Sequence, residues 1–232
     1  MRLLFVKDFL DLIFPRNCEL CGRNLIDAET CLCTLCQGKL PITNYHLRSW
    51  DNDLKSKIEG LTKVGQVMAF LNFSKSGKSQ EILHKLKYRN KPEIGRYLGN
   101  LYGKLLINSD FFFNWNVIVA VPLHEMKRVR RGYNQSDEFA RGLSEVLNIP
   151  VVQSLKRVVS TETQTKKSRL QRLENVENVF VVENPESIKG KNILLVDDVM
   201  TTGATLSSCA NVLLASHAKN VDLACIAAGG KI

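Results

Sequence analysis

The sequence predicts an α/β domain in which a parallel sheet is flanked by helices, preceded by a small cysteine-rich segment. Three short apolar runs, at 117–121, 192–196 and 221–227, have the length and composition of buried strands. Helical patterns at 134–147 and 204–216 separate these runs, and such alternation is typical of parallel sheets with helices on both faces. Two CxxC pairs before residue 40 indicate the appended segment.

The length and composition fit one α/β domain with a small appendage. The chain has 232 residues, of which 44% are hydrophobic and 24% charged, so a sizeable core can be buried. We place the boundary so that residues 1–45 hold an amphipathic helix and a zinc-binding segment, and residues 46–232 form the α/β domain. We find no apolar stretch of about 18 residues and therefore expect a chain that does not span a membrane.

The first fourteen residues have apolar side chains at helical spacing, interrupted by charges. Lys7, Asp8 and Asp11 break the apolar run that an export signal would need. We expect a short amphipathic helix that packs on the protein, with attachment to the membrane surface as the alternative. The predicted location is the cytoplasm, and peripheral association with the inner membrane is the alternative.

The cysteine-rich segment has the spacing of a metal site. Two CxxC turns separated by eleven residues each place two thiolates on one side of a turn, and together they complete a tetrahedron. The predicted ligands are Cys18, Cys21, Cys33 and Cys36. Zn²⁺ in a structural role is the expected metal, because four thiolates leave no open position; an iron–sulfur cluster or redox thiols are the alternatives. Cys31 is a further candidate that can replace Cys33.

The residues between the cysteine-rich segment and the apolar run at 117–121 combine polar, strand-like and helical patterns of side chains. Residues 41–60 are polar and are interpreted as a connector. Residues 64–73 indicate a strand or the arm of a hairpin, and two helices follow at 78–90 and 92–107. The residues from 61 to 135 carry thirteen Lys and Arg against four Asp and Glu, so the positive charge of the chain is concentrated there. Such a surplus attracts phosphate groups, either small ones or a nucleic-acid backbone.

The segment after the strand at 192–196 has the composition of a phosphate-binding loop. Two acids, three threonines and a glycine lie within the nine positions 197–205, where the strand leads into the helix that starts near residue 204. Ligands of parallel sheets bind at the carboxyl ends of strands, and a helix N-terminus there offers free N–H groups to a phosphate. The predicted phosphate and ribose residues are Asp197, Asp198, Val199, Met200, Thr201, Thr202, Gly203, Ala204 and Thr205.

The two adjacent acids need an explanation, because carboxylates repel a phosphate. Hydrogen bonds from two ribose hydroxyls to the acids provide one, since acids recognise ribose in this way in dinucleotide-binding folds. A nearby Mg²⁺ ion that neutralises the charge provides a second explanation. The site is therefore expected to hold a sugar phosphate or a nucleotide.

A second loop, after the strand at 117–121, is strongly basic and is predicted to lie at the same edge of the sheet. Arginine suits phosphate because its planar group donates two parallel hydrogen bonds. The candidate phosphate-binding residues of this loop are Pro122, Leu123, His124, Arg128, Arg130 and Arg131. Tyr133 either stacks on a base or packs against the protein, and the residues alone leave both open.

The segment from Val196 to Thr205 resembles the phosphoribosyl-diphosphate motif of type I phosphoribosyltransferases. Together with the residues from Val121 to Gln135, Leu86-Lys87-Tyr88 and the CxxC pairs, it resembles the ComF family of competence proteins across nearly the whole chain. The resemblance implies a type I phosphoribosyltransferase-like fold. It also implies that Asp197 and Asp198 hold the ribose, that the threonine loop holds the 5′-phosphate, and that the basic loop holds pyrophosphate.

The resemblance further implies a hood over the site, expected at about 60–75 and 156–177. The residues assigned to the hood, to the acceptor or to DNA are Tyr133, Asn134, Gln135, Gln164, Arg169, Arg172 and Lys87. Lys87 lies in a run of basic residues on the helix at 78–90. This run is interpreted either as a track for a nucleic-acid backbone or as a solvated helix face.

Two functions remain open at this point. The first is a binding protein that holds phosphoribosyl diphosphate or a nucleotide and assists uptake or handling of single-stranded DNA in natural transformation, as the family resemblance implies. Its expected partners are single-stranded DNA and a competence helicase or membrane channel component. The second is an active Mg²⁺-dependent phosphoribosyltransferase, in which the protein positions the substrates and stabilises developing charge. A fold alone does not establish catalysis.

Overall fold

The computed structural model describes residues 15–26, 28–108, 114–158 and 179–229. At its centre is a four-stranded sheet with the order β1-β6-β5-β2, in which every neighbouring pair is parallel. The four strands are β1 (Val67–Asn72), β2 (Val117–Ala120), β5 (Asn192–Met200) and β6 (Asn220–Ala228). Their carboxyl ends lie at one edge of the sheet, where ligands of parallel sheets bind.

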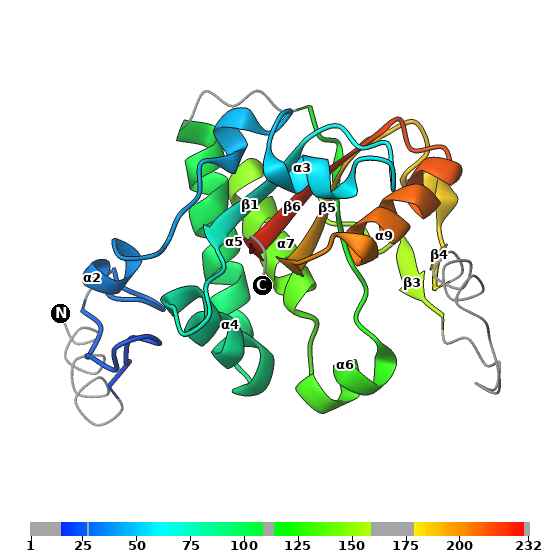
Figure 1. The fold of residues 1–232 in the computed structure, drawn as a ribbon. Helices are drawn as coiled ribbons and strands as arrows, with labels where there is room; N and C mark the ends of the chain where they lie inside the picture. The colour runs from blue at the N-terminus through cyan, green and yellow to red at the C-terminus, as the bar shows by residue number, and fades with distance from the viewer. Residues whose placement is uncertain (1–14, 27, 109–113, 159–178, 230–232) are drawn as a thin grey trace, which may run out of the picture.

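Helices cover both faces of this sheet, as Figure 1 shows. One face packs against α4 (Lys78–Tyr88), α5 (Pro92–Asn108) and α7 (Gln135–Leu147). The other packs against α3 (Asp53–Ile58) and α9 (Ala204–Ala215). Alternate residues of β5 point to opposite faces, so Leu194 joins the first core and Leu195 the second. The predicted α/β class with helices on both faces is confirmed.

Helices α5 and α7 approach each other closely, and a glycine makes this contact possible. A Cβ atom on Gly142 would lie 2.0 Å from the carbonyl oxygen of Arg96. Any side chain at this position would therefore push the two helices apart. The close packing holds α7 against the sheet, and the N-terminus of α7 lies at the edge where β2 ends.

Smaller elements surround the sheet. An antiparallel pair, β3 (Leu155–Arg157) and β4 (Phe180–Val182), flanks α9, and α6 (Glu125–Arg131) follows β2 and projects below the sheet in Figure 1. The remaining short helices are α2 (Thr34–Gln37), η1 (Tyr45–Arg48) and η2 (Pro185–Ser187).

Four sequence-based expectations need correction. The predicted connector at 41–60 contains η1 and α3, and Leu54 and Ile58 of α3 are buried against the sheet. The strand expected within 64–73 is confirmed at 67–72; it pairs in parallel within the main sheet, so this stretch is neither the alternative hairpin arm nor part of a hood. The strand expected to end at 196 continues to Met200, because its later residues still pair with β6. The basic loop contains helix α6, whose residues are all at least partly exposed and therefore give no periodic apolar signal.

Several expectations fall outside the described residues. The predicted amphipathic helix at 1–14 and most of the expected hood at 156–177 lie there. Among the residues that are described, no helix combines the length and the apolar character that crossing a bilayer requires.

Candidate functional site

The site is built around the connection from β5 to α9. Asp197 and Asp198 lie within the last four residues of β5, and the exposed Thr201 and Thr202 form the turn into α9. Ala204 and Thr205 open the helix with their side chains exposed. The 12-residue helix therefore points its N-terminal N–H groups, and the positive end of its dipole, toward the solvent beside the acids.

The backbone of this turn depends on Gly203. Its φ is +79°, a left-handed conformation that L side chains rarely adopt, and it is the N-cap of α9. A Cβ atom here would also lie 2.2 Å from Cγ2 of Ile58 on α3. Met200, just before the turn, is 1% exposed and packs into the same core, so its side chain anchors the turn. Val199 packs partly against the opposite core.

Asp197 is the more enclosed of the two acids. Its Oδ1 accepts hydrogen bonds from the hydroxyl of Ser136, at 2.9 Å, and from the backbone N–H of Asp198, at 2.8 Å. Burial, followed by the charge of Asp198, raises the pKa of Asp197 to about 7. Ser136 was not predicted as a site residue. Its position in the first turn of α7, directly after the Asn134-Gln135 motif, was the available signal.

Asp198 is paired with a cation from a distant part of the chain. Nζ of Lys87 lies 3.0 Å from Oδ2 of Asp198, and the two side chains are only 22% and 17% exposed. Lys87 belongs to the last turn of α4. The predicted ribose-binding acid and one of the residues assigned to the acceptor or to DNA are therefore in direct contact.

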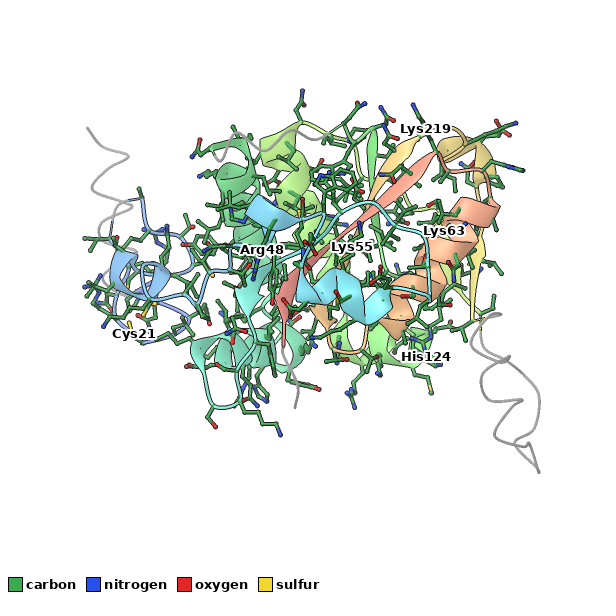
Figure 2. The ribbon with its side chains drawn as sticks, turned by 45° about the horizontal axis from the view of Figure 1, so that its top comes forward. Cys21, Arg48, Lys55, Lys63, His124 and Lys219 are labelled. Atoms are coloured by element: carbon green, nitrogen blue, oxygen red, sulfur yellow. The ribbon has the colours of Figure 1, made fainter. Side chains whose placement is uncertain are left out.

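The basic loop after β2 is ordered by two helix caps. His124 is the N-cap of α6, and its Nδ1 accepts a hydrogen bond from the N–H of Met126, at 3.3 Å. Asn134 is the N-cap of α7, and its side-chain amide donates to the carbonyl of Val121, at 3.0 Å. The loop is thereby fixed at both ends. In Figure 2, His124 of this loop lies far from Cys21 of the cysteine segment.

Tyr133 and Gln135 have structural contacts inside this loop. The hydroxyl of Tyr133 donates to the carbonyl of Leu86 and accepts a hydrogen bond from the N–H of Lys91, at 3.2 Å. Gln135 is fully buried, and its Oε1 accepts a hydrogen bond from Arg131, at 2.6 Å. Of the two interpretations left open for Tyr133, its contacts favour packing over stacking on a base.

Two cavities are lined by most of the basic residues that were predicted to belong to the site. One, of about 480 Å³, is lined by Lys87, Tyr88, Arg130 and Arg131 among others, and Arg131 stacks over the Tyr88 ring at 5.3 Å. The other, of about 330 Å³, lies beside the basic loop. Its lining includes Pro122, Leu123, Arg128, Asn134 and Asp137. Burial raises the pKa of Asp137.

The structure thus brings together the two loops that the sequence assigned to one site. Lys87 and Arg131 both border the cavity of about 480 Å³, and Lys87 contacts Asp198. Gln164, Arg169 and Arg172, which were assigned to the hood, lie outside the described residues.

The cysteine segment forms a second site around α2, at the left of Figure 1. The sulfur atoms of Cys18, Cys21, Cys33 and Cys36 all lie within 4.8 Å of one another. A tetrahedral site with Zn–S bonds of about 2.3 Å requires sulfurs about 3.8 Å apart. The Cys21 and Cys33 sulfurs are 3.7 Å apart, and the N–H of Cys33 donates to the sulfur of Cys18 at 3.3 Å. The donor set and spacing fit a tetrahedral thiolate site that can hold a metal such as zinc.

The structure also separates Cys31 from this cluster. Cys31 is 4% exposed, and burial followed by the charge of Glu19 raises its pKa to about 12. At Cys18, burial also raises the pKa, but hydrogen bonds from the backbone N–H groups of Cys21, Cys33 and Leu20 outweigh it and lower the pKa to about 6. Burial, followed by hydrogen bonds with the neighbouring cysteines, raises the pKa of Cys36 to about 12 as well. The position of Cys31 outside the four clustered sulfurs, and not its pKa, therefore distinguishes it from the candidate ligands.

Comparison with known proteins finds a similar domain and a similar solved structure. A model of the phosphoribosyl transferase domain matches residues 133–231, a range that includes the acidic pair and the threonine turn. Among solved structures, the allosteric regulatory enzyme of purine biosynthesis aligns with 62% of this chain and 30% of its own, at 19% identity and a TM-score of 0.44.

Three curated relatives carry names connected with DNA or competence. The DNA utilization protein YhgH of Escherichia coli O157:H7 is 32% identical over 149 residues, 62% of this chain and 65% of that protein. Competence protein F of Haemophilus influenzae is 28% identical over 217 residues, 86% of this chain and 91% of that protein. Competence protein ComFC of Bacillus subtilis is 32% identical over 139 residues, 58% of this chain and 53% of that protein.

The match spans less than two thirds of the length of the first of these relatives. The matching transferase domain, the parallel sheet, the four-cysteine cluster and the similarity to these relatives support a ComF-type, phosphoribosyltransferase-like protein.

Proposed function

We propose that this protein binds phosphoribosyl diphosphate, together with Mg²⁺, at the β5–α9 connection and handles single-stranded DNA in natural transformation. The observation that carries the proposal is the pair Asp197-Asp198, held at the end of β5 beside the exposed threonine turn and the N-terminus of α9. This arrangement supports a ligand that has both sugar hydroxyls and a phosphate.

The charge balance of the site supports a ligand that brings a cation with it. Lys87 compensates Asp198, while Asp197 forms no ion pair with any residue that the structure describes, and its pKa is raised to about 7. A Mg²⁺ ion bound to the diphosphate would supply positive charge near the acids and so favour the ionised form of Asp197. Arg128, Arg130 and Arg131 of α6 are the proposed diphosphate residues, since Arg128 borders one cavity of this region and the other two arginines border the second.

The DNA role rests on charge and on relatives. The net charge of the chain is +9, and Arg130, Arg131 and Lys87 border one cavity together with the exposed ring of Tyr88. Cations beside an aromatic ring are a common arrangement in sites for single-stranded nucleic acid. The relatives named for competence and for DNA utilization support the same role. A competence helicase or a membrane channel component remains the proposed partner in the cell.

Two titrations test the proposal. Phosphoribosyl diphosphate with Mg²⁺ is added to the full chain and binding is followed by calorimetry, with the Asp197→Ala, Asp198→Ala double variant as control. In parallel, single-stranded DNA is titrated over a salt series. The proposal predicts saturable sugar-phosphate binding that the double variant loses, and DNA affinity that falls steeply with salt. Equal binding by the double variant, or a DNA affinity independent of salt, contradicts it.

The second candidate function is catalysis by the same site. The presence of both the acidic pair and the arginine-rich loop favours it, since these would hold the ribose and the leaving pyrophosphate. Pyrophosphate release is measured with phosphoribosyl diphosphate, Mg²⁺ and each nucleobase in turn. Release above that of the Asp197→Ala, Asp198→Ala variant identifies a transferase, whereas binding without release restricts the function to ligand binding.

A further inference from the structure

The cysteine cluster and the acidic pair belong to different parts of the fold, yet one helix contacts both. Glu19, between the two cysteines of the first CxxC turn, lies 3.1 Å from Nζ of Lys91 through its carboxylate. Its backbone carbonyl accepts a hydrogen bond from Nζ of Lys85. Its N–H donates to the carbonyl of Cys31 at 3.0 Å, so the two cysteine-bearing stretches are connected through this residue. Glu19 therefore joins the metal-binding turn to residues on either side of the end of α4.

The same stretch of chain is also held by the basic loop. The hydroxyl of Tyr133 donates to the carbonyl of Leu86, and the N–H of Lys91 donates to that hydroxyl at 3.2 Å. Lys87 lies between these attachments in the sequence and contacts Asp198 at 3.0 Å. The stretch from Lys85 to Lys91 is thus contacted by three separate parts of the fold: the first CxxC turn, the basic loop and the end of β5.

These contacts restrict where the Lys87 ammonium group can lie. Helix α4 ends at Tyr88, and the left-handed Asn90, with φ of 51°, turns the chain into α5. A helix end without such attachments frays, and fraying would move Lys87 relative to Asp198. The partly buried ion pair depends on the distance between its charges, because a displaced Lys87 leaves Asp198 uncompensated beside Asp197.

We infer that Glu19 is a positioning residue for the sugar-phosphate site: through Lys91 and Lys85 it fixes the end of α4 and so holds Lys87 against Asp198. The metal-binding segment would then act on ligand affinity through α4, without touching the ligand. For its effect on ligand binding, the inference rests on the proposed function.

Charge-swap variants of the full chain test the inference. Lys91 also lies 3.5 Å from Glu93, so all variants and their reference are made in a Glu93→Gln background. There, Glu19→Lys and Lys91→Glu each break the pair, and the double variant restores it with the charges exchanged. We expect each single variant to weaken binding of Mg²⁺ and phosphoribosyl diphosphate about five-fold, and the double variant to return within about two-fold of the original affinity. Arg89→Glu is the matched control for Lys91→Glu, because it makes the same change of charge two residues away on an exposed side chain.

Two further measurements separate positioning from a general loss of structure. The first is the metal content per chain of each variant. If Glu19→Lys loses metal, Lys91→Glu provides the test, because the Lys91 substitution leaves the CxxC turn unaltered. In a Lys87→Met background, Glu19→Lys is expected to cause no further loss of affinity, because the path through Lys87 is already removed. Additive losses in that background, or no recovery in the charge swap, overturn the inference.

Hydrogen exchange of the ligand-free protein provides a readout that does not depend on the proposed function. We expect Glu19→Lys and Lys91→Glu to accelerate amide exchange at 85–91 and at 196–205, and the charge swap to reverse this. Unchanged exchange at 196–205 overturns the inference even where the ligand binds. If the original protein fails to bind phosphoribosyl diphosphate while exchange changes as expected, the proposed function fails and the positioning role of Glu19 stands.

Discussion

Lys87 of α4 lies 3.0 Å from Asp198 of β5, although 111 positions separate the two residues in the sequence. The contact places a cation beside one of two adjacent carboxylates and leaves the other, Asp197, bonded to Ser136. The two acids therefore have different surroundings. One is paired with a lysine, and the other is enclosed, so that its raised pKa brings its titration close to neutral pH.

Replacing Lys87 tests the importance of this ion pair. Lys87→Met should weaken binding of Mg²⁺ and phosphoribosyl diphosphate about five-fold, or ~1 kcal/mol, because Asp198 loses its compensating charge. Calorimetric titration measures the change. Arg89→Met removes the same charge from an exposed side chain of the same region and should change the affinity less than about two-fold. Equal losses in the two variants would show that only the overall charge matters.

The raised pKa of Asp197 predicts that stability depends on pH. Its pKa is about 7 in the folded protein and 3.8 for an unperturbed aspartate, so the folded state holds the proton more tightly. The stability therefore falls as pH rises from about 4 to about 7, and the full penalty is present above about pH 7. Asp197→Asn removes this penalty and should stabilise the protein more at about pH 8 than at about pH 4.

Thermal unfolding at both pH values measures this difference. The amide oxygen that Asp197→Asn introduces can still accept the hydrogen bonds from Ser136 and from the N–H of Asp198. The comparison therefore isolates the charge. A stability difference between the variant and the original protein that is the same at both pH values would contradict the raised pKa.

Gly203 should tolerate no side chain. Gly203→Ala forces a non-glycine residue to φ of +79° and places its Cβ against Ile58, so we expect a loss of about 2–4 kcal/mol in unfolding free energy. Gly60→Ala is the matched control, since φ is +84° there and no atom lies within 4 Å of the added carbon. Chemical denaturation should show a loss of only about 1 kcal/mol for the control.

The cysteine cluster predicts which thiols bind metal. Cys33→Ser should reduce zinc content from about one ion per chain to almost none, because it removes one of four clustered sulfurs. Cys31→Ser should keep the zinc and lose only stability, since Cys31 is buried outside the cluster. Metal analysis of the purified variants distinguishes the two. Loss of zinc from the Cys31 variant would reassign the ligand.

The arginines of α6 predict a specific change in DNA binding. Arg130 is exposed and borders the cavity that also contains Lys87. If it contacts a phosphate of single-stranded DNA, Arg130→Ala should reduce the slope of log affinity against log salt by about one. Lys104→Ala, on α5 and beside a different cavity, should leave the slope unchanged. The same slope for the Arg130 variant and the original protein would remove α6 from the DNA path.

Much of the fold could be predicted from local patterns. The apolar runs at 117–121, 192–196 and 221–227 became β2, β5 and β6, because continuous apolar stretches can be buried only in the centre of a layered fold. The two CxxC pairs likewise determined the four clustered sulfurs, since each turn fixes its own two thiols. The Asp197–Thr205 segment was recognisable because its acids, threonines and glycine are close together in the chain.

Other elements could not be predicted, for physical reasons that are specific to each. Helix α3 has only two buried apolar residues, Leu54 and Ile58, which is too short a pattern to distinguish a helix from a polar connector. Helix α6 buries none of its residues, so its sequence lacks the apolar stripe that reveals a helix. Strand β5 extends past two acids because β6 pairs with that stretch, although acids disfavour strands.

The sequence by itself determined the class of fold, the four clustered sulfurs and the loop that carries the acids, since each depends on residues close together in the chain. Only the tertiary structure decided which groups face those acids. Lys87 and Ser136 contact the acids because α4 and α7 pack beside the end of β5. Glu19 contacts Lys91 because the first CxxC turn packs beside the end of α4. Packing between distant segments has no local sequence pattern, and the raised pKa of Asp197 follows from that packing.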